Sequence, residues 1–279
     1  MELPLTPTIR FAINRISAPR LGFADFAALV RRLGVDAVEI RNDLPGVECV
    51  DGTPAATIAA AAGANGLVVR SINALQRFDR FDAERRAEAE ALIRYALESG
   101  AQALVLCPTN SRQDTRSAGQ RHADLVHALR QLEPLLGAAG LVGLVEPLGF
   151  EECALRRKSQ AVRAFEEIGA GATLRLVHDT FHHHLAGEGL FFPEWTGLVH
   201  LSGVEDPALA ATQMRDGHRV LVGPGDRLGN AAQLRRLLDA GYAGYASFEP
   251  FAEEIACAPD IEARLRSSME HLRQAVAAA

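Results

Sequence analysis

Short runs of β-branched and aliphatic residues recur along the chain at intervals close to the roughly 30 residues that one strand-plus-helix unit occupies. Each run is nearly continuous apolar sequence, which is typical of strands that are covered on both faces. The pattern therefore predicts eight strands. They cover residues 9–14, 36–41, 67–75, 103–108, 142–148, 174–180, 198–203 and 245–251.

The longer segments between these runs carry apolar residues at i, i+3, i+4 and i+7, which is the spacing of amphipathic helices. Several of them end in glycine, the residue that most readily takes the left-handed conformation at the end of a helix. The clearest predicted helices cover residues 23–34, 82–100, 121–140, 159–169 and 230–242, with glycines at Gly34, Gly100, Gly140, Gly169 and Gly241.

Eight such units favour an α/β fold, a single (β/α)8 TIM barrel in which eight parallel strands are surrounded by outer helices. An open doubly wound sheet is the alternative, but no predicted strand is followed by the G-x-G-x-x-G fingerprint of dinucleotide-binding folds. Only 20 residues separate Asp179 from His200, so we expect the sixth helix to be short or irregular. Neither a linker nor a low-complexity run divides the sequence, which predicts one domain over residues 1–279.

Composition narrows the range of partners and compartments. The net charge is −6, and no cluster of basic residues could follow a phosphate backbone, so nucleic acid is not an expected partner. The four cysteines are widely spaced, the first residues lack a signal-peptide pattern, and no apolar run approaches the roughly 18 residues of a membrane span. We therefore expect a cytoplasmic protein without membrane association. The oligomeric state stays open, with a homodimer as one alternative.

Ionisable residues stand where four consecutive predicted strands end: Glu146, Asp179, His200 and Glu249 close the fifth to eighth apolar runs. Because the active sites of TIM barrels are built at the C-terminal ends of the strands, we expect these side chains to share one site. Three carboxylates gathered there would repel one another unless a cation lay among them. Three oxygen donors and one nitrogen donor suit one divalent metal ion, with Mn²⁺ or Zn²⁺ expected and Mg²⁺ or Co²⁺ as alternatives.

Three further residues are candidates for substrate binding. His182 follows Asp179 by three residues and could face the same site, and Arg219 could bind a substrate oxygen. A surface salt bridge is the alternative for Arg219. Lys158, the only lysine among the 29 basic residues, lies in the loop after the fifth strand and could reach the substrate. A solvated lysine at the start of a helix is the alternative for this residue.

Over essentially its whole length the sequence resembles the xylose-isomerase-like TIM-barrel superfamily of sugar isomerases and epimerases, and within it the inosose (2-keto-myo-inositol) isomerases of inositol catabolism. The motifs that carry the resemblance are VEIR at 38–41, SINAL at 71–75, DTFH at 179–182, VHLSGVED at 199–206, RVLVGPG at 219–225 and SFEPF at 247–251.

This resemblance implies a cis-enediolate proton transfer that depends on a divalent metal. It implies that Glu146 and Glu249 are both metal ligands and the catalytic acid–base pair, and that Asp179 and His200 complete the metal site. It also implies that His182 and Arg219 bind substrate oxygens. The DNA repair enzymes of the superfamily that resemble endonuclease IV use a trinuclear zinc cluster with further histidines after strands three and four. Here SINAL and CPTN stand in those places, so a trinuclear site is not expected.

The sequence therefore predicts an enzyme, a divalent-metal-dependent isomerase or epimerase that acts on a keto-sugar or inosose. Its partner would be a small sugar or cyclitol substrate. Two alternatives stay open. The first is a dehydratase of the inosose or 3-dehydroshikimate type that uses the same metal site. The second is a barrel that binds carbohydrate without catalysis, because a shared fold does not by itself establish a reaction.

Overall fold

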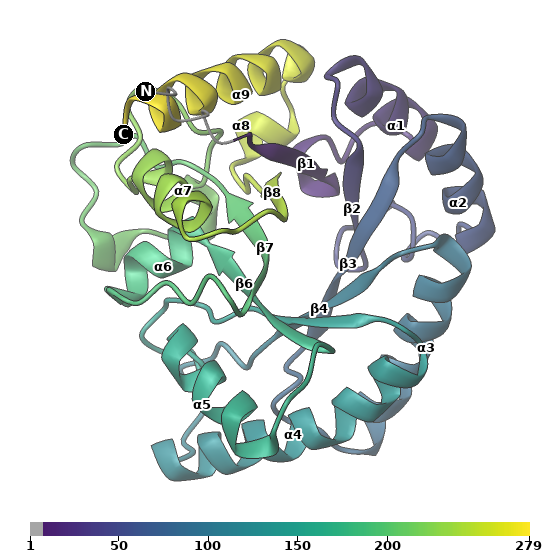
Figure 1. Cartoon of the computed structure of the whole chain (residues 1–279). Coiled ribbons are helices and arrows are strands. Elements are labelled where there is room, and N and C mark those ends of the chain that lie inside the picture. The colour runs from purple at the N-terminus through teal and green to yellow at the C-terminus, as the bar shows by residue number, and fades with distance from the viewer. Residues whose placement is uncertain (1–7) are drawn as a thin grey trace, which may run out of the picture.

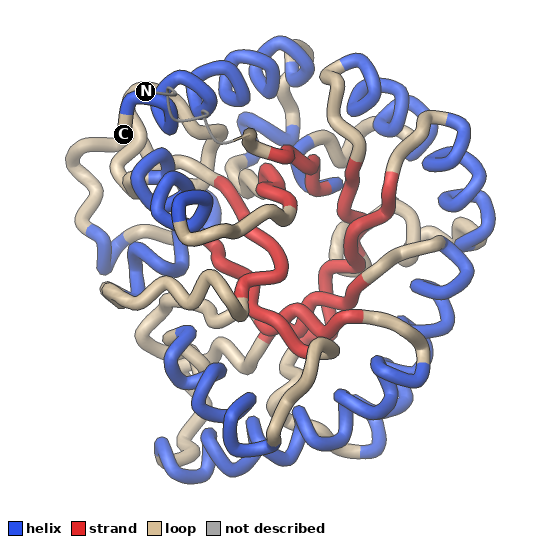
Figure 2. The backbone as a smooth tube through the Cα atoms, in the orientation of Figure 1, coloured by secondary structure: helices blue, strands red, loops and turns tan. Residues whose placement is uncertain are grey.

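A computed structural model describes residues 8–279 of the chain. Eight parallel strands form a closed barrel in which each strand pairs with its neighbours in sequence and β8 pairs with β1. The helices lie outside the strands and surround them as a ring (Figures 1 and 2). The predicted TIM barrel is confirmed.

Each of the eight predicted strands overlaps an observed one. The strands are β1 (Arg10–Asn14), β2 (Ala37–Arg41), β3 (Val68–Gln76), β4 (Ala103–Cys107), β5 (Val142–Val145), β6 (Leu174–Asp179), β7 (Thr196–Leu201) and β8 (Tyr245–Phe248). The helices are α1 (Phe23–Arg32), α2 (Ala55–Ala64), α3 (Ala83–Ser99), α4 (Ala118–Ala138), α5 (Lys158–Ile168), α6 (Thr180–Ala186), α7 (Asn230–Asp239), α8 (Glu253–Ala256) and α9 (Ile261–Ala278).

The five predicted helices correspond to α1, α3, α4, α5 and α7, and the five glycines at their ends all have positive φ, between 65° and 92°. The sixth helix is short, as expected: α6 has seven residues and irregular chain connects it to β7. Periodicity did not reveal α2, because seven of its ten residues are alanine and its two faces hardly differ. It also did not reveal α9, which follows the last strand.

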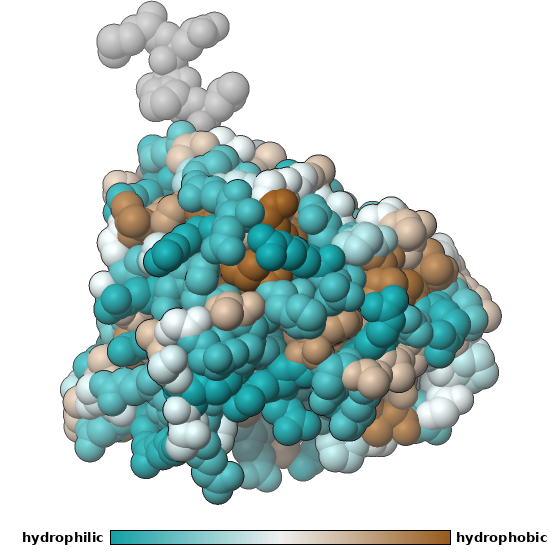
Figure 3. Space-filling view, turned by 90° about the horizontal axis from the view of Figure 1, so that it is seen from below, coloured by the Kyte–Doolittle hydropathy of each residue, from teal (hydrophilic) through white to brown (hydrophobic). Residues whose placement is uncertain are grey.

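Two apolar layers hold the barrel together. Large aliphatic and aromatic side chains fill the space between the strands and the helices. The barrel interior is built from smaller residues, among them the fully buried alanines Ala12, Ala37, Ala74 and Ala103. On the side shown in Figure 3 the outer surface is mainly hydrophilic, with hydrophobic side chains in separate patches. None of the helices within residues 8–279 combines the length and the apolar character that a membrane span requires.

Candidate metal centre

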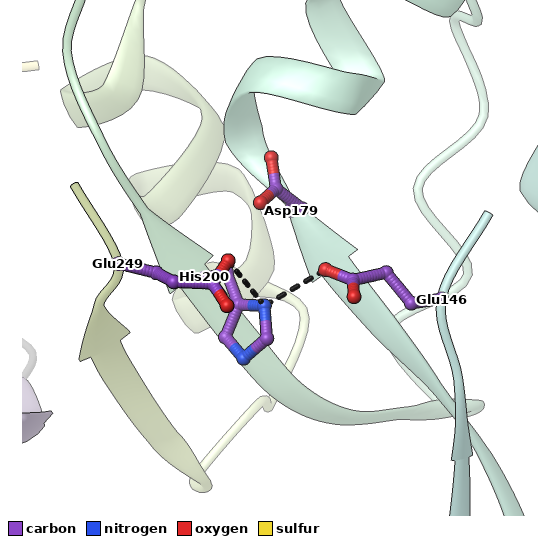
Figure 4. A group of neighbouring side chains, drawn as sticks. All are labelled: Glu146, Asp179, His200 and Glu249. Atoms are coloured by element: carbon purple, nitrogen blue, oxygen red, sulfur yellow. Dashed lines mark hydrogen bonds and ion pairs between the residues drawn. The ribbon is translucent and has the colours of Figure 1, made fainter. Parts of the chain in front are cut away.

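Four ionisable side chains meet at the C-terminal end of the barrel (Figure 4). Glu146, Asp179 and His200 each stand two positions after a buried residue of the barrel interior, and alternate residues of a strand share a face. Asp179 is the partner of His200 in the ladder between β6 and β7, so the two lie at the same height. Glu249 follows β8 directly. Alternation along the strands therefore directs the side chains of Glu146, Asp179 and His200 into the barrel.

The four side chains are close enough to bind one ion. Each offers one ligand atom, and these atoms all lie within 4.8 Å of one another. The Nδ1 atom of His200 lies 2.8 Å from Oε1 of Glu146 and 3.2 Å from Oε2 of Glu249, which approach it from opposite sides in Figure 4. All four residues are at most 4% exposed. The structure thus brings together the four predicted ligands.

The electrostatics of the cluster favour a positive charge among the carboxylates. Burial by itself would lower the pKa of His200, but the charges of Glu249, Glu39 and Glu146 outweigh it and raise that pKa well above its ordinary value. Burial would raise the pKa of Glu249, but His200 and Arg219 hold it well below its ordinary value. Buried carboxylates that stay ionised need a cation close by.

The donor set fits a divalent metal ion. Three carboxylates and one imidazole are the ligand types that Mn²⁺ and Zn²⁺ accept, and the site offers them from four rigid strand ends. Glu146, Asp179, His200 and Glu249 are therefore the residues that could hold a metal in this chain.

Arg219 belongs to the same centre. Its Nη2 atom lies 2.5 Å from Oδ2 of Asp179 and 3.1 Å from Oε2 of Glu249, and its Nε donates to Oγ of Ser202 at 2.9 Å. The side chain is almost completely buried, so the surface salt bridge considered as its alternative is excluded. Arg219 compensates the charge of two of the four ligand residues, Asp179 and Glu249, and its role in substrate binding stays a prediction.

His182 lies directly beside the centre. Asp179 caps α6, and its Oδ1 accepts a hydrogen bond from the backbone N–H of His182 at 2.9 Å. The ring packs edge-on against Phe150 and Phe181, and its Nδ1 atom is buried without a hydrogen-bond partner. Its predicted role in substrate binding stays a prediction.

Lys158 does not join the centre, contrary to the prediction. It is the first residue of α5, and its Nζ atom lies 2.8 Å from Nδ1 of His178 and 3.1 Å from the carbonyl oxygen of Phe191. Because His178 immediately precedes Asp179 in β6, it points to the opposite face of the strand. Lys158 is thus buried outside the barrel interior, on the side of the strands that faces the helices. Its position after β5 in the sequence does not determine whether its side chain points into the barrel or toward the helices.

Three residues at the centre were missed by the sequence analysis. Glu39 of β2 lies 3.2 Å from Nε2 of His200, and Nη1 of Arg41 lies 2.7 Å from Oε1 of Glu249. Asn14 donates to both glutamates, Glu39 and Glu249, at 3.3 Å. A signal for two of them is present, because Glu39 and Arg41 stand two positions apart in the apolar strand AVEIR and therefore face the barrel interior together.

Comparisons with known proteins agree with this architecture. A family model for the xylose isomerase-like TIM barrel matches residues 27–275. A xylose isomerase domain containing protein from Salmonella typhimurium is 35% identical, with a TM-score of 0.87 over 98% of this chain and 99% of that one. The IolI protein, whose structure contains a zinc atom, is 18% identical, with a TM-score of 0.84 over 97% of this chain and 99% of that one.

A sugar epimerase has the same fold. D-psicose 3-epimerase from Clostridium cellulolyticum, solved with D-tagatose, is 16% identical, with a TM-score of 0.73 over 96% of this chain and 99% of that one. No curated protein matches the chain.

Proposed function

The chain belongs to the xylose isomerase-like TIM barrel family, and we propose that it is a divalent-metal-dependent isomerase or epimerase of an uncharged keto-sugar or inosose. The observation that carries this proposal is the convergence of Glu146, Asp179, His200 and Glu249 within 4.8 Å. The zinc atom of the IolI protein and the ketohexose bound by D-psicose 3-epimerase support a metal and a sugar substrate for this fold.

The positions of Glu146 and Glu249 support a proton transfer between two carbons or two faces. A divalent ion bound here would polarise a ketone oxygen and its neighbouring hydroxyl, so that the C–H bond on the hydroxyl-bearing carbon next to the ketone becomes more acidic. One glutamate would accept the proton from carbon and the other would return a proton, either to the next carbon or to the opposite face. Their approach to His200 from opposite sides supports this division of work.

The two glutamates differ in how firmly they are held. Arg41, Arg219 and Asn14 all donate to Glu249. Oε2 of Glu146, in contrast, has the thiol of Cys107 at 3.5 Å as its neighbour. Since fewer donors hold its carboxylate, we assign the first proton abstraction to Glu146.

The charge balance of the centre favours an uncharged substrate. Arg41 forms two hydrogen bonds to Asp43, at 2.8 and 2.7 Å, in addition to its bond to Glu249. Arg219 is paired with Asp179, Glu249 and the more exposed Asp216. Both guanidinium groups are thus already compensated, and an acid of the dehydroshikimate type would find neither of them free. A keto-sugar or inosose needs only hydrogen bonds, so the charge balance disfavours the 3-dehydroshikimate type of dehydratase.

Hydrogen exchange in D₂O tests the proposal directly. The protein, loaded with Mn²⁺ or Zn²⁺, is incubated with a panel of inososes and ketohexoses, and NMR follows the loss of a C–H signal at one carbon. We expect Glu146→Gln and Glu249→Gln to slow that exchange by roughly 10²- to 10⁴-fold, because each removes an acid–base group. Glu205→Gln, an exposed residue in the loop after β7, is the matched control and should exchange normally.

Three results would contradict the proposal. Full exchange in the two folded glutamine variants would remove Glu146 and Glu249 from the reaction. A product that absorbs in the ultraviolet would instead identify a dehydratase. Binding of metal and polyol by the unsubstituted protein, without any exchange across the panel, would identify a barrel that binds carbohydrate without catalysis.

A further inference from the structure

Glu39 lies behind His200, on the side of the imidazole ring that faces away from the proposed metal ligands. The two ring nitrogens have different neighbours: Nδ1 faces Glu146 and Glu249, whereas Nε2 lies 3.2 Å from Oε2 of Glu39. Glu39 reaches His200 from β2, across the barrel interior from β7, and is fully buried. The ring is therefore held between carboxylates on both sides.

Donors from neighbouring strands fix the carboxylate of Glu39. The Ser71 hydroxyl donates to its Oε2 atom at 2.5 Å, and the Asn73 amide donates to the same atom at 3.2 Å. The Asn14 amide donates to its Oε1 atom at 3.3 Å. The strand registers place two of these residues directly beside it, since Glu39 is the ladder partner of Asn14 and of Ser71. Three side-chain donors thus hold the carboxylate of Glu39 in place beside His200.

We propose that Glu39 is a positioning residue that selects the form of His200 able to bind the metal, an inference that rests on the proposed function. An acceptor at Nε2 requires that the proton of a neutral imidazole sit on Nε2. The lone pair of Nδ1 then points at Glu146 and Glu249, where the ion would be bound. Carboxylates in this place orient the ring and make the ligand nitrogen more basic.

Asn14 connects Glu39 to Glu249, one of the four proposed metal ligands. Its amide nitrogen lies 3.3 Å from Oε1 of Glu39 and 3.3 Å from Oε1 of Glu249. The side-chain oxygen of Asn14 accepts the backbone N–H of Ile16 at 3.1 Å, so the amide cannot turn over without losing that bond. Glu39 and Glu249 are therefore kept at a fixed separation by one rigid group.

The affinity for metal, measured without substrate, tests the inference. Zn²⁺ and Co²⁺ are titrated against a chelator into the full chain and into Glu39→Gln. A glutamine at position 39 keeps an oxygen atom that can accept from His200, but it lacks the negative charge of the carboxylate. Its NH₂ group would face the NH₂ group of Asn14, so that two donors oppose each other. We expect Zn²⁺ and Co²⁺ to bind roughly 10- to 100-fold more weakly to the variant. In the Zn²⁺ form the ¹⁵N signal of Nε2 of His200 should shift, because the proton on that nitrogen loses its charged acceptor.

Two matched controls separate positioning from general damage. Glu48 is a buried carboxylate that binds Arg15 at 2.8 Å, so Glu48→Gln should leave the metal affinity unchanged. If Glu39→Gln does not fold, Ser71→Ala removes one donor to Glu39 and should weaken binding a few-fold. Its control is Ser17→Ala, which removes a buried hydroxyl that donates to the carbonyl of Phe248 at 3.1 Å.

The outcomes distinguish this inference from the proposed function. Normal metal affinity in a folded Glu39→Gln or Ser71→Ala variant overturns the role of Glu39 and leaves the function standing. An equal loss in Glu48→Gln also overturns it, because the effect would not be specific. An unsubstituted protein that binds neither Zn²⁺ nor Co²⁺ would overturn the proposed function as well.

Discussion

Two buried histidines on adjacent strands, His200 and His178, sit in opposite electrostatic surroundings. Both are completely buried. His200 faces the barrel interior, where the surrounding carboxylates raise its pKa well above the ordinary value in spite of burial. His178 faces the helices, where burial and then the charges of Lys158 and His183 push its pKa well below the ordinary value. Equal burial is thus accompanied by pKa shifts in opposite directions.

The outer cluster, formed by His178, Lys158, Gln233 and Phe191 on the outer face of β6, favours a neutral His178 ring. Nδ1 of His178 lies 2.8 Å from Nζ of Lys158, and its Nε2 lies 2.9 Å from Oε1 of Gln233, which suits a neutral ring that accepts on one side and donates on the other. The ring stacks on Phe191 at 5.2 Å. Burial also lowers the pKa of Lys158 to about 7. The partners of a buried imidazole, and not its depth, therefore decide whether the site suits a cation.

The largest effect is expected when each of the two histidines is replaced by glutamine. His200→Gln removes the positive charge between buried carboxylates and should lower the free energy of unfolding by about 3–5 kcal/mol. His178→Gln breaks only neutral hydrogen bonds and should cost about 1–3 kcal/mol. Urea unfolding at pH 7 with excess EDTA measures both. Equal losses for the two variants would show that the charge of His200 contributes nothing.

The pH dependence of Lys158→Met tests the outer cluster. The pKa of Lys158 in the folded chain, about 7, lies below the 10.5 of an ordinary lysine, so the unfolded chain binds more protons between these values. Stability of the natural chain relative to the variant should therefore rise with pH in this window. From pH 7 to 8.5 the difference should grow by about 1.5 kcal/mol, and below pH 6 it should stay constant. A difference that is flat from pH 6 to 8.5 would mean that Lys158 titrates normally.

The smallest effect is expected at the cap of α5. Glu188 accepts the backbone N–H groups of Lys158 and Ser159 at 2.9 and 3.1 Å, which places a negative charge at the N-terminus of the helix. Glu188→Gln should cost about 0.5–1 kcal/mol and leave the metal affinity unchanged. Thermal unfolding and the Zn²⁺ titration measure the two quantities. The control is Glu194→Gln, which changes an exposed residue on the same connection between α6 and β7. A weaker metal affinity in Glu188→Gln alone would show that the outer cluster and the metal centre are coupled.

The sequence was most informative where a simple period controls the structure. The ends of four consecutive apolar runs and the rule that barrel sites lie at strand ends were enough to predict Glu146, Asp179, His200 and Glu249 as one cluster. Glu39 and Arg41 were missed, although they alternate along β2, because His200 and Glu249, the site residues that they contact, lie far away in the sequence. One domain over residues 1–279 stays a prediction, and the pairing of β1 with β8 supports it.

Lys158 shows the opposite limit. Its place in the loop after β5 was known, but the side of the barrel wall that it faces depends on how α5 packs against β6 and on the connection through Phe191. Such packing involves residues far apart in the sequence. A residue at the start of a helix is for this reason harder to assign than a strand residue, whose direction follows from its neighbours.

The burial of Lys158 has a practical consequence. It is the only lysine in the sequence, and 4% of it is exposed. An amine-directed reagent can therefore modify a lysine side chain in this protein only when the layer between β6 and the helices opens. Because each local opening has its own free energy, the rate of labelling would measure how often this one part of the barrel wall opens. The chain thus contains a built-in reporter on the outer face of the strand that carries Asp179.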